Sequence, residues 1–234
     1  KGRGLRSTGT SMSTLSDIEQ ATGQSFPPLF HQIAAEGRAD WGALGNPWFR
    51  EVFPTLLAQP PLLLHANEFE PIEQGELRDA WEDLAAEDHY NPLREDLQLL
   101  PFARSGAGDT YCFWTNAPGF AEAPVLLVWH DDDRADVLAA NLQDFLFRKM
   151  VEAVAELEAE YTTLVEGDLA ANLQAWLGSH RSWLRDDQAT ALEALFARTD
   201  DIADGRISDE EAQALVKQVI GCPRLDESFA YVRT

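Results

Sequence analysis

Three consecutive aspartates and a histidine follow a strongly apolar segment of the sequence. His130 and Asp131–Asp133 come directly after Val125–Trp129, which reads VLLVW. Clustered carboxylates and an imidazole can bind a divalent cation or transfer protons. The alternative is a solvated turn that ends a strand. The sequence favours the turn, because no second metal-binding motif such as HExxH or DxD accompanies the cluster.

A second acidic pattern lies near the end of the sequence. Residues 200–211 read DDIADGRISDEE, and they match the calcium loop of an EF-hand at positions 1, 5, 6, 9 and 12, which are Asp200, Asp204, Gly205, Ser208 and Glu211. Ile202 stands at position 3, where an EF-hand has an oxygen ligand. We therefore expect calcium to bind weakly at best, and Ile202→Asp to strengthen that binding. The alternative is a structural helix-loop-helix, and no other cofactor is expected.

The remaining polar residues predict no catalytic site. The five histidines are His31, His65, His89, His130 and His180, and they lie in unlike surroundings without the spacing of metal ligands. The glycine pair Gly106 and Gly108 precedes a predicted strand rather than a helix, so it is typical of a turn and not of a phosphate-binding loop. The sequence therefore favours a protein that is not an enzyme.

Alternation of apolar runs with turn residues predicts consecutive antiparallel strands in the middle of the chain. The predicted strands are Leu97–Ala103, Thr110–Trp114 and Val125–Trp129, with a short fourth at Asp136–Ala139. The turn after the first reads SGAGD, in which glycines supply backbone conformations with positive φ. The nearly continuous apolar run at 125–129 indicates a central strand covered on both faces.

Helical patterns surround this predicted sheet. Two short helices are expected within 14–37, one around 48–57, one over 70–91, and one that begins at the N-cap Asn141 and runs to Tyr161. Three more are expected at 168–177, 186–198 and 208–220. The sequence thus predicts an α+β domain at 12–162, with a mostly antiparallel sheet flanked by helices, and an all-α extension at 163–234 packed on it. Residues 1–11 (KGRGLRSTGTS) are interpreted as a remnant of an expression tag.

The charge of the chain limits its partners. The formal net charge is −22 over 234 residues, which repels nucleic-acid phosphates and anionic membranes. Neither is expected as a ligand, and a basic protein partner is favoured; the alternative is an acidic surface that is only solvated. Two scattered cysteines, no secretion signal and no apolar run long enough for a membrane span favour the cytoplasm.

The order of several short segments in the chain resembles that of a known protein family. A proline-bounded strand, the SGAGD turn, YCF, an apolar strand that ends in Trp-His, an Asp-rich turn and a helix beginning NLQDFL together resemble the SUKH superfamily over 99–150, with further similarity at 17–37. That superfamily includes yeast cell-wall synthesis regulators and many bacterial immunity proteins.

The resemblance implies an immunity protein that binds a toxin and occludes its active site. Contacts with a toxin are expected from exposed carboxylates near the strand ends and on the helix that precedes them, namely Glu73, Glu76, Glu87, Asp109, Asp131, Asp132 and Asp133. Two other hypotheses remain at this point: an intracellular regulator or scaffold that responds to calcium through the appended helices, and a hydrolase that uses the Asp131 cluster.

Overall fold

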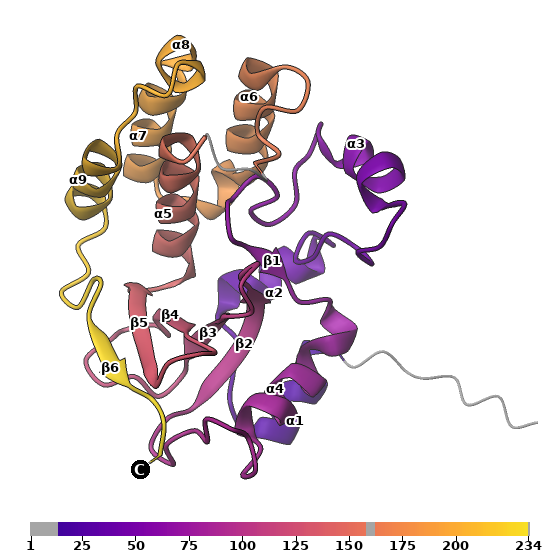
Figure 1. Ribbon diagram of the computed structural model, residues 1–234, viewed down its shortest axis with the longest axis vertical. Coiled ribbons are helices and arrows are strands. Elements are labelled where there is room, and N and C mark those ends of the chain that lie inside the picture. Colours follow the sequence, from indigo (N-terminus) through magenta and orange to yellow (C-terminus); the bar gives the residue numbers. More distant parts are fainter. Residues whose placement is uncertain (1–13, 158–161, 234) are drawn as a thin grey trace, which may run out of the picture.

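The computed structural model describes residues 14–157 and 162–233, and it contains one six-stranded antiparallel sheet with helices (Figure 1). The strands lie in the sheet in the order in which they occur in the chain: β1 (Glu70–Pro71), β2 (Leu99–Arg104), β3 (Thr110–Trp114), β4 (Val125–Val128), β5 (Arg134–Ala139) and β6 (Ser228–Ala230). The predicted α+β class is confirmed, and the four predicted strands correspond to β2 to β5. The two short strands at the sheet edges, β1 and β6, were not predicted.

The helices largely follow the predicted segments. They are α1 (Leu15–Thr22), α2 (Pro28–Ala35), a π-helix (Trp48–Val52), α3 (Phe53–Leu56), a 3-10 turn (Gln74–Glu76), α4 (Leu77–Ala85), α5 (Leu142–Ala155), α6 (Leu169–His180), a 3-10 turn (Arg181–Trp183), α7 (Asp186–Phe196), α8 (Thr199–Ala203) and α9 (Asp209–Val219). Side-chain caps fix several helix starts: Asn141 accepts a hydrogen bond from the backbone of Asp144, and Asp168 accepts one from Ala171. The helical region predicted after α5 is confirmed.

Two predicted helices are longer in the sequence interpretation than in the structure. The helix expected over 70–91 forms only at Leu77–Ala85, as α4. Its predicted start belongs to the sheet instead, because Pro71 lies in β1 and the backbone N–H of Ile72 donates to the carbonyl of Phe102 on β2. Pairing with the sheet therefore replaces helical hydrogen bonds at this end. The helix expected to reach Tyr161 ends as α5 at Ala155, and residues 158–161 lie outside the described part of the chain.

Both faces of the sheet are covered by apolar side chains. On one face, Phe102 and Phe113 stack at 4.3 Å between ring centroids and pack against Phe30 of α2 and Phe145 of α5. This cluster continues without interruption into the buried residues of α6, α7 and α9. The opposite face contributes Cys112, Trp114, Leu126, Val128 and Val137 to a second cluster, which also contains Leu84 of α4 and Tyr231.

The end of the chain closes this second face. β6 pairs with β5 along the edge of the sheet, visible in yellow in Figure 1. Tyr231 is 1% exposed; its hydroxyl donates to the carbonyl of Trp129 at 2.8 Å and accepts from Asn91 at 3.2 Å. The backbone carbonyl of Tyr231 accepts from Arg94 at 2.9 Å. The last strand is therefore fixed both to the sheet and to the segment that precedes β2.

A seam of buried polar groups joins the loop at residues 62–67 to the C-terminal helices. His180 is fully buried, and its Nε2 accepts a hydrogen bond from the backbone N–H of Leu63 at 3.1 Å. His65 is 1% exposed; its Nδ1 lies 2.9 Å from the hydroxyl of Thr163, and its Nε2 has no partner in the described part of the chain. Burial lowers the pKa of His65 to about 4 and the pKa of His180 well below its usual range.

Acid is expected to weaken the folded state through this seam. The pKa of His65 is 6.5 when unfolded and about 4 when folded, so the unfolded chain binds the proton first and stability is lost as the pH falls from about 6.5 to 4. The gap of about 2.5 pH units corresponds to roughly 3 kcal/mol from His65 alone, and His180 acts in the same direction. Urea unfolding at pH 7 and pH 4.5 measures how much free energy of unfolding each protein loses between the two pH values. We expect the wild type to lose more than His65→Gln and His65→Leu, which lack the imidazole. Equal pH dependence in all three proteins would contradict this assignment.

Candidate functional site

One buried carboxylate joins the turn after β2 to the turn after β4. Asp109 is 4% exposed and accepts hydrogen bonds from the backbone N–H of His130 at 3.1 Å and from the ring Nδ1 of His130 at 2.8 Å. The hydroxyl of Ser105 donates to the same carboxylate at 3.0 Å. Gly108 closes its turn with a φ of 100°, a conformation that favours glycine. The two turns are therefore held as one unit.

The pairing changes the charge state of both groups. Burial opposes ionisation of Asp109, but hydrogen bonds from His130 and Ser105 outweigh this and lower the pKa of Asp109. The hydrogen bond to Asp109 raises the pKa of His130 above its usual value. The pair therefore favours an ionised Asp109 and a protonated His130, with the exposed part of the imidazole at the surface.

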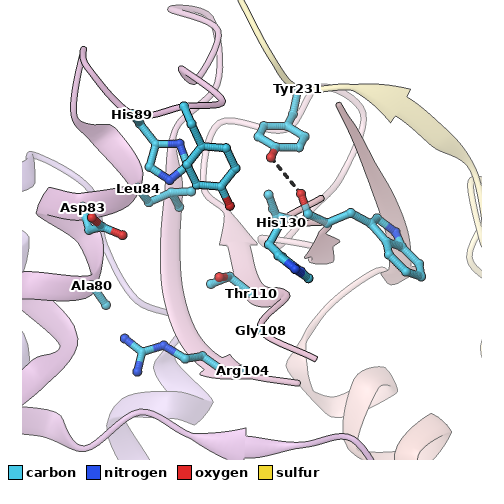
Figure 2. Close-up of a pocket in the computed structure, with 12 residues that line it drawn as sticks. Ala80, Asp83, Leu84, His89, Arg104, Gly108, Thr110, His130 and Tyr231 are labelled. Carbon is cyan, nitrogen blue, oxygen red and sulfur yellow. Dashed lines mark hydrogen bonds between the residues drawn. The ribbon is translucent and has the colours of Figure 1, made fainter. Parts of the chain in front are cut away.

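A cleft of about 250 Å³ opens beside this unit, between α4 and the ends of the strands (Figure 2). We call it the α4 cleft, and it is lined by Ala80, Asp83, Leu84, His89, Tyr90, Arg104, Gly108, Thr110, Val128, Trp129, His130 and Tyr231. In Figure 2, the strand-end residues Arg104, Thr110 and His130 lie across from Ala80 and Asp83 of α4. The sheet thus supplies the floor of the cleft, and the helix supplies one wall.

None of the predicted partner contacts lines this cleft, but six of the seven follow or precede its lining residues in the sequence or line the hollow beside it. Asp131–Asp133 are exposed and directly follow His130, while Glu87 is exposed between α4 and His89. Glu73 and Glu76 line a smaller hollow together with Arg104, which borders both hollows. Segments that are far apart in the sequence therefore place their carboxylates around one region. We call these six residues the acidic rim.

Asp109 requires a correction. It was predicted as a surface contact, but its carboxylate is buried and is already bonded to His130 and Ser105. A polar turn residue beside glycines gives no sequence signal of burial, because the partner that encloses it comes from another hairpin. The carboxylate of Asp109 is therefore not an exposed contact for a partner.

Sequence interpretation missed three residues of the cleft. Arg104 is the last residue of β2, Tyr90 lies in the loop after α4, and Tyr231 comes from beyond the last helix. None belongs to a motif, and only the fold brings them together. The one available signal was weak: Arg104 stands beside the glycine turn that the sequence had already singled out.

One group of potential metal ligands occurs in the parts of the chain that the structure describes. Asp109, His130 and Asp131 each offer a ligand atom within 4.8 Å of the others. The Nδ1 of His130 faces the carboxylate of Asp109 at hydrogen-bond distance, so these groups already satisfy one another. The geometry is that of a hydrogen-bonded turn.

The structure does not bring the EF-hand-like residues together as a calcium loop. Asp200 and Ile202 lie in α8, and Ser208 caps α9 by accepting a hydrogen bond from the backbone N–H of Glu211 at 3.2 Å. Arginines already engage the other two carboxylates: Asp204 pairs with Arg206, and Glu211 pairs with Arg198. The pattern that resembled an EF-hand here forms a helical turn followed by a helix start.

Comparison with family models identifies the family of the chain. Residues 9–148 match the model of the SMI1 / KNR4 family (SUKH-1), which is more than half of the chain. The chain belongs to this family. Searches of curated proteins and of solved structures found no match. The SUKH-1 match extends from before α1 into α5, so all residues of the α4 cleft except Tyr231 lie inside it.

The helices α6 to α9 and the strand β6 follow the part that matches the SUKH-1 model. Their buried residues nevertheless belong to the same apolar clusters as the sheet. No helix in the described residues is long and apolar enough to cross a membrane.

Proposed function

We propose that this SUKH-1 protein is an immunity protein, which binds a cognate bacterial toxin in the cytoplasm and neutralises it by occluding the toxin's active site. Membership of the family supports this proposal, since immunity proteins occur in the SUKH superfamily. The observation that carries the proposal is the acidic rim. Its six carboxylate residues come from three separate segments, which either adjoin lining residues of the α4 cleft in the sequence or line the hollow that shares Arg104 with it. An inhibitor of this kind needs shape and charge complementarity and turns over no substrate.

The net charge indicates how a partner would be found. A formal charge of −22 attracts a basic protein. Salt at physiological ionic strength screens this attraction beyond about 8 Å. Such attraction accelerates association more than it slows dissociation. We therefore expect higher salt to slow the binding of the toxin and to change its dissociation much less.

Charge reversal of the rim is expected to weaken binding without unfolding the protein. The variant Asp131→Lys, Asp132→Lys, Asp133→Lys changes three exposed side chains, whose one ion pair in the described residues, Asp132 with Arg134 at 3.4 Å, is exposed on both sides. We expect the association rate to fall at least about tenfold at low salt. Stopped-flow kinetics and growth rescue by co-expression with the toxin encoded beside this gene measure the effect.

A second triple variant serves as the matched control. Glu51→Lys, Glu122→Lys and Asp200→Lys change the net charge by the same amount at exposed positions away from the α4 cleft. The proposal requires that this control retain most of the association rate and the rescue. If both variants lose binding equally, net charge alone is responsible and the rim is not the contact surface. If the protein neither binds the product of a neighbouring gene nor restores growth in its presence, the regulator or scaffold hypothesis replaces the immunity hypothesis.

A further inference from the structure

The α4 cleft holds several hydrogen-bond donors that the protein itself does not use. The backbone of Arg104 pairs with Glu70 on β1 and Thr110 on β3, but its guanidinium has no hydrogen bond or ion pair with any described residue, although Asp83 lines the same cleft. The side-chain hydroxyls of Thr110 and Tyr90 and the Nε2 of His130, which line the same cleft, also have no hydrogen-bond partner in the described residues. An arginine presents five N–H donors in a planar fork. Among the arginines of the described residues, only Arg50 and Arg104 have a guanidinium without an ion pair or hydrogen bond.

Exposed apolar groups flank the same arginine. Four large apolar side chains are exposed in the described residues, namely Leu44, Phe49, Tyr90 and Val165. Two of them adjoin Arg104: Tyr90 shares the α4 cleft with it, and Leu44 shares the smaller hollow. Tyr90 is 67% exposed, and its ring lies 4.3 Å from that of His89. Tyrosine and arginine are among the residues that most often dominate the energy of protein interfaces.

We propose that the α4 cleft is the anchor of the partner interface, in which Arg104 and Tyr90 hold a partner loop by its main-chain carbonyl oxygens. This inference rests on the proposed function, because it assumes a protein partner. The occupant is a loop of a basic protein. Its backbone carbonyls supply acceptors for Arg104, Thr110 and His130 without bringing a negative charge among the carboxylates of the rim. Tyr90 adds apolar contact area at the edge of the loop.

This division of labour predicts two kinetic classes of residue. The acidic rim acts at a distance and sets the association rate, whereas Arg104 and Tyr90 act only after contact and set the dissociation rate. We expect Arg104→Ala and Tyr90→Ala each to raise the dissociation rate of the toxin complex by roughly tenfold or more, with an association rate within about twofold of wild type. Arg104→Lys keeps the charge but loses the fork, so its dissociation rate lies between those of wild type and Arg104→Ala.

Arg50→Ala is the matched control, because Arg50 is also exposed and unpaired in the described residues but does not line the cleft. Surface plasmon resonance with the toxin encoded beside this gene compares the four variants, and thermal unfolding confirms that each remains folded. Dissociation rates for Arg104→Ala and Tyr90→Ala within twofold of Arg50→Ala would overturn the inference while leaving the proposed function intact. Failure of wild type to bind that toxin would overturn both.

Discussion

Replacing Tyr231 with alanine is expected to lower the free energy of unfolding by about 3–5 kcal/mol, the range for removing a large buried aromatic side chain. Tyr231 is 1% exposed within the second apolar cluster, next to the side of the sheet that carries Cys112 and Trp114. Its loss leaves a cavity that the surrounding strands fill only in part. Urea unfolding followed by tryptophan fluorescence measures the change.

Two further variants separate the contributions at this position. Tyr231→Phe retains the ring but loses the hydrogen bonds to the carbonyl of Trp129 and from Asn91, so we expect a loss of about 1–2 kcal/mol. Tyr90→Ala removes an equally large ring that is 67% exposed and is expected to change stability by no more than about 0.5 kcal/mol. A loss below 1 kcal/mol for Tyr231→Ala would show that the buried ring of Tyr231 is not required to close the second face of the sheet.

Ile202→Asp is expected to destabilise the protein by about 4 kcal/mol or more rather than to create a calcium site. Ile202 is fully buried in the main apolar cluster, so the variant loses a core side chain and places a carboxylate where water cannot solvate it. Sequence interpretation predicted stronger calcium binding from the same change, because position 3 of an EF-hand loop carries an oxygen ligand. In the structure, Ile202 lies in the apolar core and not in a metal-binding loop.

Unfolding with and without calcium distinguishes the two outcomes. We expect no stabilisation of Ile202→Asp by millimolar calcium, and a loss of only about 0.5–1.5 kcal/mol for Ile202→Val, which keeps an apolar side chain. A calcium-dependent rise in the melting temperature of Ile202→Asp, together with heat of binding in titration calorimetry, would show that the loop can take up the ion after all.

Strong local patterns predicted most of the fold. The alternating TYCFW and the apolar VLLV form β3 and β4, and their side chains are buried because both faces of the sheet are covered. Asn141 caps the start of α5, as its residue type indicated. The edge strands could not be predicted in this way. β6 has only three residues, and it exists because Phe229 pairs with Ala135, a contact that no local sequence encodes.

In the candidate site, too, local sequence predicted some features and others depend on tertiary contacts. The Asp-rich turn and its histidine were visible in the sequence, because several polar residues stand together after an apolar run. Burial of Asp109 and the position of Arg104 at the junction of two hollows depend on how β2, β3 and β4 align, so they became visible only in three dimensions. The segment at 200–211 was ambiguous for a related reason, because short acidic motifs occur both in metal loops and at helix starts. Of the arginines that pair with it here, Arg198 lies before the segment and Arg206 stands within it, at a position where the EF-hand pattern does not specify the side chain.

The pairing of β6 with β5 has a consequence for folding during synthesis. β1 to β5 and α5 have all been made before the helices α6 to α9, yet the strand that closes the sheet comes after them. Until the ribosome releases that strand, the edge of β5 is unpaired, and the side of the sheet that carries Trp114 lacks Tyr231. An unpaired strand edge next to exposed apolar surface is prone to aggregate. The nascent chain thus passes through a vulnerable interval, in which chaperone binding would be of most use to it.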